Sequence, residues 1–382
     1  MAKKQEAFLK GIDSAAIISL SEKIRESWND FFLESKYCQS QIRFGSDERS
    51  NYMGDLLNYF DDTIELLAKI PLKQDYQQAL YDTVSVLQLM YVGQDLIDEL
   101  RMVFKMTKST GEGKALIRTL RNELTGHPIS RDKGNNFVSS VFFTRNSHGS
   151  VIEYLRYHKD TDYKAEVVRH SWSDLVKIHE DYLTKNLGEI IATIKKKLRS
   201  YQLQLGKFDS SFLKMDIAGL VNRTEHLLES IFEYSALYSK PNLWYYFQRQ
   251  ELHPRYQVAT DRFIQDLKTA LVETRENIAE YRNDSKQNFN NLEHAGTTKI
   301  TFTSGGGKQS STSNVKSTLR YEFSKFRERH PIFGIDYFID HFQNDPELKA
   351  ELQHLKLVYN DDCEFHCSIE YISFLLKKQN LL

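Results

Sequence analysis

The sequence predicts a mainly α-helical protein: an N-terminal four-helix bundle, a β-hairpin, a second helical bundle and a C-terminal region of short helices. The chain of 382 residues contains only 6 prolines and 17 glycines. So few turn-forming residues favour long helices over many short strands. Apolar residues recur at three- and four-residue spacing along most of the chain, and one segment alone is rich in strand-forming residues.

Four amphipathic stretches predict the N-terminal bundle, which we assign to residues 1–135. Each carries apolar residues on one helical face, and Pro71 follows the second stretch. The stretches run over about 17–31, 57–67, 81–104 and 114–126. Four such helices joined by short loops are typical of a helical bundle.

A β-hairpin is predicted within residues 136–165. Asn136–Arg145 and Ser150–His158 are rich in Val, Ile, Phe and Tyr, and Asn146–Gly149 lies between them as a turn. The alternation of apolar and polar residues in the two strands is imperfect.

The helical period returns in residues 166–290, which we expect to form a second helical domain. A long helix is predicted from about Ser173 to Leu205, with an apolar heptad pattern in its second half. Two more helices are predicted near 211–239, closed by Pro241, and near 256–284.

A flexible linker is predicted over residues 291–314, because it contains the low-complexity run Ser304–Ser311. Thr298–Thr303 is compatible with a short strand just before that run. The final region, 315–382, is predicted to form short helices broken at Pro331 and near Asp361.

Charge and cysteine usage bound the class of protein. Lys and Arg number 51 against 52 Asp and Glu, which gives a formal net charge of −1. Any contact with nucleic acid must therefore come from local patches. Three cysteines without a disulfide framework are typical of a reducing cytoplasm. No apolar run approaches the ~20 residues of a membrane span, so we expect a cytoplasmic protein with no membrane contact.

Two motifs resemble cofactor or metal sites, and neither is complete. Gly305–Lys308 is followed by Gln309, where a phosphate-binding loop needs Ser or Thr, so a flexible linker is the better interpretation. Cys363, His366 and Cys367 have no second Cys/His pair at a spacing that zinc requires, which favours a partly buried helix. We therefore expect neither a cofactor nor a metal.

Two other segments carry residue types that bind nucleic acid. Tyr245, Tyr246 and Phe247, followed by Arg249 and Arg255, could stack on bases, although core packing is the more common role of such rings. A basic cluster is formed by Lys195, Lys196, Lys197 and Arg199. The ordinary alternative for that cluster is the solvated face of a helix.

The most informative segment is Arg121–Pro128, at the end of the fourth predicted helix. Gly126 fits the left-handed position beyond a helix C-terminus, and Pro128 keeps His127 out of the helix. Arg121 offers a permanently charged fork for phosphate oxygens, and histidine moves protons near neutral pH. The pair could act on a phosphodiester without a metal, or it could simply cap the helix end.

Residues 120–128, Leu-Arg-Asn-Glu-Leu-Thr-Gly-His-Pro, resemble the signature of the HEPN superfamily (higher eukaryotes and prokaryotes nucleotide-binding), an Arg, a polar residue and a His a few residues later. The resemblance covers roughly residues 14–130. It implies a HEPN-like four-helix bundle and a metal-independent endoribonuclease of toxin or defence type, in which two protomers pair their motifs in a homodimer. It also implies RNA as substrate and, in some members, a restraining protein partner or antitoxin.

Two hypotheses follow. In the first, the protein is an endoribonuclease: His127 moves the proton, Arg121 stabilises the charged phosphate of the transition state and Asn122 orients one of them. In the second, the bundle is a non-catalytic scaffold that dimerises or binds nucleotide, RNA or a protein. The intact Arg-Asn…His spacing favours the enzyme, whereas the near-neutral net charge favours the scaffold.

Overall fold

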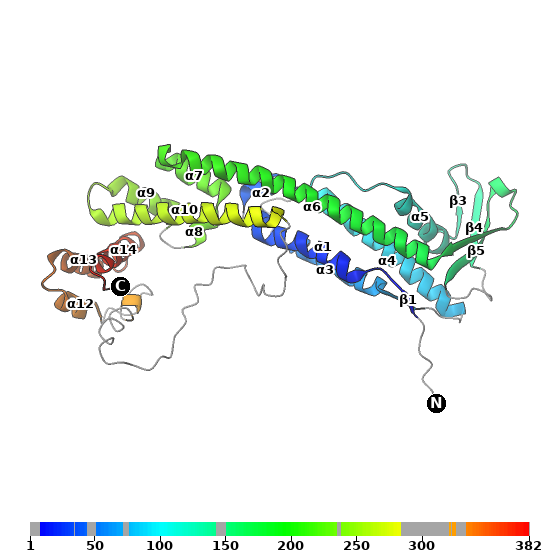
Figure 1. Cartoon of the computed structure of the whole chain (residues 1–382), viewed down its shortest axis with the longest axis horizontal. Coiled ribbons are helices and arrows are strands. Elements are labelled where there is room, and N and C mark those ends of the chain that lie inside the picture. Colours follow the sequence, from blue (N-terminus) through cyan, green and yellow to red (C-terminus); the bar gives the residue numbers. More distant parts are fainter. Residues whose placement is uncertain are drawn as a thin grey trace, which may run out of the picture. The chain divides into compact units, whose positions relative to one another are not determined.

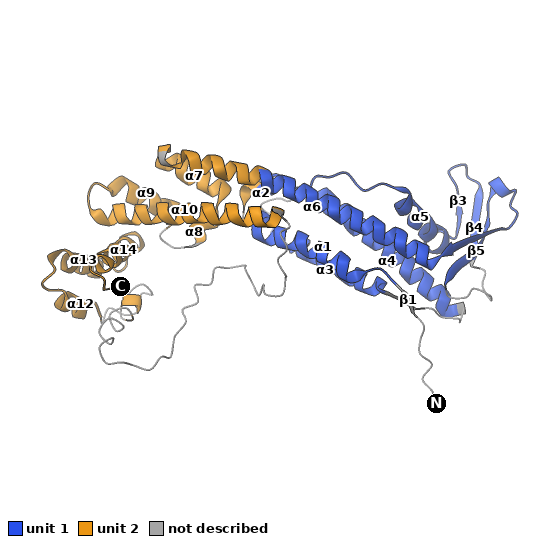
Figure 2. Ribbon diagram, viewed as in Figure 1, with its two compact units in different colours: residues 1–33, 38–199 blue, residues 34–37, 200–382 orange. Residues whose placement is uncertain are grey.

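The protein is mainly helical, with a small antiparallel sheet between two groups of helices in the chain order (Figure 1). The computed structural model describes residues 8–33, 35–43, 51–71, 76–142, 150–234, 238–283, 321, 323–325 and 334–381. The chain divides into two compact units, one comprising residues 1–33 and 38–199 and the other 34–37 and 200–382 (Figure 2). The predicted linker at 291–314 and the glycine run within it lie outside the described residues.

The four predicted N-terminal helices are all present in the first unit. Their bounds are α1 Ser14–Ser27, α3 Tyr52–Leu67, α4 Tyr76–Val103 and α5 Glu112–Arg121. Helix α1 packs on α3, α3 on α4 and α4 on α5. The apolar stripes that predict these helices supply their buried faces, including Ile17, Phe60 and Ile117, each fully buried.

Short elements extend this bundle. Helix α1 continues into a π-helical turn, Trp28–Phe32, and helix α2 covers Lys36–Ser40. Strands β1, Phe8–Lys10, and β2, Lys69–Pro71, form a two-stranded antiparallel sheet.

The predicted hairpin is confirmed as the centre of a four-stranded antiparallel sheet with the order β3-β4-β5-β6. The strands are β3 Ile129–Arg131, β4 Phe137–Phe142, β5 Val151–Tyr157 and β6 Glu166–Ser171. The turn expected at Asn146–Gly149 lies outside the described residues. Strand β6 occupies residues where we expected the second helical domain to begin.

The long predicted helix is confirmed as α6, Trp172–Ser211, of which residues 172–199 belong to the first unit. Its inner face buries Leu183, Leu187 and Ile194 completely. His179 is also fully buried on this helix, and neither of its ring nitrogens has a hydrogen-bond partner in the described structure. Burial lowers the pKa of His179 to about 3.

The single helix expected near 211–239 is wrong, because that stretch is broken. A 3-10 turn at Phe212–Lys214 precedes α7, Ile217–Leu227, and α8, Ile231–Tyr234. Asp216 starts α7 by accepting a hydrogen bond from the backbone N–H of Gly219 at 2.8 Å. Leu228, with φ −142° and ψ 54°, ends that helix.

Pro241 opens a helix rather than closing one. It lies in the first turn of α9, Lys240–Arg249, where a missing backbone N–H leaves no helical hydrogen bond unmade. Helix α10, Pro254–Asn283, matches the next predicted helix closely.

The C-terminal region forms short helices, as the sequence predicts. They are α12 Ile335–His341, α13 Pro346–Leu357 and α14 Asp362–Lys378. The expected break near Asp361 is confirmed, because its side chain caps α14 by accepting from the N–H of Glu364 at 3.1 Å. The expected break at Pro331 lies outside the described residues. A buried apolar core that includes Phe338, Leu352 and Phe365 joins the three helices.

Candidate functional site

The candidate site lies where α5 ends and the sheet begins. Gly111, with a φ of +139°, precedes α5 in a conformation that favours glycine. From there the helix turns Ile117 and Leu120 into the core, and Leu124 follows them. Arg118 and Arg121, in the last turn, are both half-buried.

A buried ion pair fixes the start of α5 against α4. The Lys114 ammonium donates to the Asp98 carboxylate, and the Ser109 hydroxyl donates to the same carboxylate at 2.6 Å. Although burial raises the pKa of Asp98, these hydrogen bonds lower it below its usual range. The Tyr182 hydroxyl on α6 lies 2.6 Å from that of Ser109. The helix that carries the motif is therefore anchored on two neighbouring helices.

The ring of Tyr91, on α4, is shared by two arginines. The guanidinium carbon of Arg118 lies 4.5 Å from the ring centroid, and that of Arg121 lies 4.7 Å from it. Both distances fit cation–π contacts. Arg118 also pairs with Asp95, whereas no carboxylate pairs with Arg121 in the described structure.

Arg121 is held in place by neutral partners. Its Nε donates to Gln88 Oε1 at 3.1 Å and its Nη1 donates to Asn122 Oδ1 at 3.1 Å. These contacts orient the guanidinium without neutralising its charge. The structure thus brings together two of the three sequence-predicted site residues, and it adds Gln88 and Tyr91, which the sequence does not single out.

Gly126 has a different role from the expected one. The expectation of a left-handed helix cap at Gly126 is wrong: residues Asn122–Gly126 form a π-helical turn, and Gly126 has no positive φ. A Cβ atom at this position would lie 2.7 Å from Nη1 of Arg121 and 3.4 Å from Oδ1 of Asn122. The absence of a side chain at 126 leaves room for the Arg121 guanidinium over the turn.

His127 follows the π-helical turn and is exposed. Its backbone N–H donates to the carbonyl oxygen of Asn122 at 2.7 Å, which closes the turn. Within the described residues, the imidazole makes no hydrogen bond or ion pair, including none with Arg121 or Asn122. The ring is therefore accessible to a ligand.

Glu123, inside the motif, ties the turn to the sheet. Its Oε2 accepts a hydrogen bond from the Tyr154 hydroxyl at 2.6 Å, and its Oε1 lies 3.5 Å from Nε of Arg156. Burial and this hydrogen bond raise the pKa of Tyr154. Tyr154 and Arg156 are two residues apart on one predicted strand and therefore share a face. That spacing is the sequence signal that could have indicated this contact.

The aromatic segment around Tyr245 and Tyr246, a sequence candidate for base stacking, contributes to the core of the second unit. Tyr246 is fully buried, and Tyr245 donates a hydrogen bond to Glu364. Arg255 is also buried, where its guanidinium pairs with Glu351 at 2.9 Å and with Glu364 at 3.4 Å. These groups serve packing and internal pairing, as the alternative interpretation predicts.

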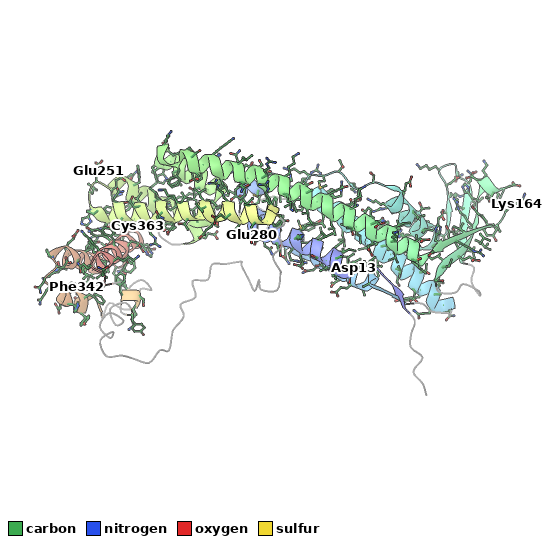
Figure 3. The ribbon with its side chains drawn as sticks, viewed as in Figure 1. Asp13, Lys164, Glu251, Glu280, Phe342 and Cys363 are labelled. Atoms are coloured by element: carbon green, nitrogen blue, oxygen red, sulfur yellow. The ribbon has the colours of Figure 1, made fainter. Side chains whose placement is uncertain are left out.

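The basic cluster and the C-terminal cysteines, the two remaining sequence candidates, also make internal contacts. Lys197 donates to the backbone carbonyl of Gln41 at 2.8 Å, so the basic cluster is only partly a solvated face. Cys363, labelled in Figure 3, lies 2.8 Å from Oδ1 of Asn242, and Cys367 is buried. No group of three or more His, Cys, Asp or Glu side chains in the described residues is arranged to hold a metal ion.

Comparisons with known proteins identify no relative: the chain matches no protein-family model, no curated protein and no solved structure. Among the residues that the structure describes, none of the helices combines the length and apolarity needed to cross a lipid bilayer.

Proposed function

We propose that the protein is a metal-independent endoribonuclease of the HEPN type, with Arg121, Asn122 and His127 as its catalytic residues. The 2′-hydroxyl oxygen of RNA attacks the adjacent phosphorus while the bond to the 5′-oxygen breaks. The products are a 2′,3′-cyclic phosphate and a free 5′-hydroxyl. His127 takes or gives the proton, Arg121 stabilises the charge on the phosphoryl oxygens, and Asn122 orients Arg121.

The observation that carries this proposal is the environment of Arg121. Its guanidinium is oriented by Gln88, Asn122 and Tyr91, and none of these neighbours removes its positive charge. An oriented charge that need not rearrange is what stabilises a phosphoryl transition state. The accessible imidazole of His127, six positions further along the chain, supplies a group that can accept and donate a proton.

The proposal includes a homodimer. Each chain contributes one imidazole to the motif, whereas transesterification needs one group to remove a proton and another to return one. A second copy of the chain can supply the second histidine, so that two motifs share one cleft. An exposed His127 at the end of a helix is compatible with such pairing.

Purified protein should cleave single-stranded RNA in excess EDTA and should not cut DNA of the same sequence, which lacks the attacking hydroxyl. His127→Ala should lower the rate by roughly 10²–10⁴-fold. His226→Ala removes an exposed histidine from α7 and serves as the matched control, with unchanged activity expected. Equal cleavage by wild type and His127→Ala would assign the activity elsewhere, and loss of cleavage in EDTA would refute a metal-independent mechanism.

The second candidate function is a non-catalytic dimerisation or binding scaffold. One observation favours it: Arg121 makes three internal contacts, which also suit a purely structural residue. In that case the wild type should cut no single-stranded RNA, and Arg121→Ala should lower the midpoint of thermal unfolding. In the enzyme, Arg121→Ala should lower the cleavage rate by ~10²–10³-fold.

A further inference from the structure

The four-stranded sheet has one packed face and one open face. Its packed face carries Tyr154 and Arg156, which contact Glu123 of the candidate site. Its outer face carries the alternate residues of each strand, and several of these are strongly exposed: Ile129 is 81%, Phe137 60% and Val167 52% exposed. A solvated sheet face is usually polar. An exposed apolar face of this kind marks a binding surface.

The strand register places an aromatic and arginine cluster at one end of this outer face. Arg131 on β3 pairs with Phe137 on β4, and its guanidinium carbon lies 4.0 Å from the Phe137 ring centroid. Ser139 pairs with Tyr157 on β5, so Tyr157 is the diagonal neighbour of Phe137 on the same face. Arg131 therefore contacts Phe137, and Tyr157 shares the same end of this face.

The strands of the outer face carry more positive than negative charge, whereas the loops at this end of the sheet carry both signs. The outer face carries Arg131 and Arg169 against one carboxylate, Glu153, which is bound to Arg169 at 2.6 Å. Lys164, labelled in Figure 3, is exposed in the β5–β6 connection together with the exposed carboxylates Asp160 and Asp162. Lys133 is exposed in the β3–β4 turn, at the same end of the sheet by the strand register. Aromatic rings for bases and cations for phosphates are the two components of single-strand binding.

We infer that this outer face binds single-stranded RNA by stacking bases on Phe137, Tyr157 and Arg131, and so delivers substrate to the candidate site. The inference rests on the proposed function. Strand β3 joins the two places: His127 and Arg131 are four residues apart, roughly 13 Å of extended chain. A short oligonucleotide can span that distance. Stacking is indifferent to sequence and to the 2′-hydroxyl, so single-stranded DNA should bind this face without being cut.

The test measures binding separately from cleavage. Full-length His127→Ala protein is titrated into fluorescently labelled oligouridylate RNA and into a thymidylate DNA of equal length, with fluorescence anisotropy as the readout. Phe137→Ser should weaken binding of both by about 5-fold to 100-fold, and Phe137→Trp should restore it. Leu357→Ser removes an 85% exposed apolar side chain from α13 and should leave affinity unchanged.

A second variant guards against misfolding at position 137. Arg131→Gln should reduce the slope of log affinity against log salt concentration by about 0.7, the contribution of one phosphate contact to a single strand. Unchanged RNA affinity in both Phe137→Ser and Arg131→Gln would overturn the inference. So would light scattering that shows the face holding two copies of the chain together, with Phe137→Ser releasing monomers and RNA affinity unaffected.

The outcomes for the face and for the enzyme are distinguishable. Binding that depends on Phe137, together with a wild type that cuts no RNA, supports RNA binding by the outer face and refutes the proposed ribonuclease activity. Cleavage that depends on His127, with a KM for RNA that is unchanged by Phe137→Ser, supports the proposed ribonuclease activity and refutes RNA binding by the outer face.

Discussion

The hydroxyl of Tyr154, in the middle of strand β5, donates a hydrogen bond to the carboxylate of Glu123, between Asn122 and the buried Leu124. The sheet is thereby attached to the π-helical turn that ends in the candidate site.

Tyr154→Phe should destabilise the protein by about 1.5–3 kcal/mol, because it removes a hydrogen bond to a charged group that is largely buried. Urea unfolding followed by circular dichroism measures the change. Tyr163→Phe is the matched control, since Tyr163 is 46% exposed in the β5–β6 connection. Equal unfolding midpoints for the two variants would show that the Glu123 contact contributes little.

Gly126→Ala should reduce cleavage about as strongly as loss of Arg121. The new Cβ would lie only 2.7 Å from Nη1 of Arg121, so the guanidinium would have to move. The displaced group is the end of a flexible side chain, so the thermal midpoint should change little. Gly188→Ala is the control: Gly188 is exposed on α6 with open space around it, and the variant should gain ~0.5–1 kcal/mol of stability. Full cleavage activity in Gly126→Ala would contradict the proposed role of the Arg121 position.

Lys114→Met should destabilise the protein by about 3–5 kcal/mol, because it leaves the Asp98 carboxylate buried without its cation. Denaturant unfolding at neutral pH measures the loss. The double variant Lys114→Met with Asp98→Asn should recover part of it, since no buried charge then remains unpaired. A double variant no more stable than the single one would show that packing, rather than charge, dominates at this position.

Acid should destabilise the first unit through His179. The pKa of this histidine is about 3 in the folded chain and roughly 6.5 in the unfolded chain. The unfolded state therefore binds a proton that the folded state rejects, and stability falls as pH decreases from 6.5 towards 3. At pH 5 the loss should be about 2 kcal/mol, because each pH unit below 6.5 contributes about 1.4 kcal/mol.

Urea unfolding of wild type and His179→Leu at pH 7.5 and pH 5 measures this effect. The variant should lose that part of the pH dependence and should be more stable at both pH values, since it removes two unpaired buried nitrogens. A wild type and variant with the same dependence on pH would place the acid sensitivity in other groups.

The helices were predictable because their signal is local. Ile17, Phe60 and Ile117 face the core at helical spacing, and that periodicity is visible without tertiary information. The sheet was only partly predictable because Phe137 and Val141, on its outer face, are as apolar as Ile152 on its inner face. Alternation is blurred when both faces carry apolar residues.

The missed features depend on contacts between distant residues. Tyr91 stands 30 positions before Arg121, and Tyr154 stands 31 positions after Glu123, so no local pattern connects them. The π-helical turn was missed because a left-handed glycine cap and a glycine that makes room for a guanidinium are identical in sequence. The break after Leu227 was missed because Leu228 continues an apolar stripe.

Strand β3 is only three residues long, and it forms one edge of the sheet. An edge so short offers few unpaired backbone groups to an incoming strand, which protects this edge from edge-to-edge aggregation. The opposite edge is β6, Glu166–Ser171, which is twice as long. Growth of the sheet by strand addition should therefore begin at β6, and lengthening β3 should open the second edge to it.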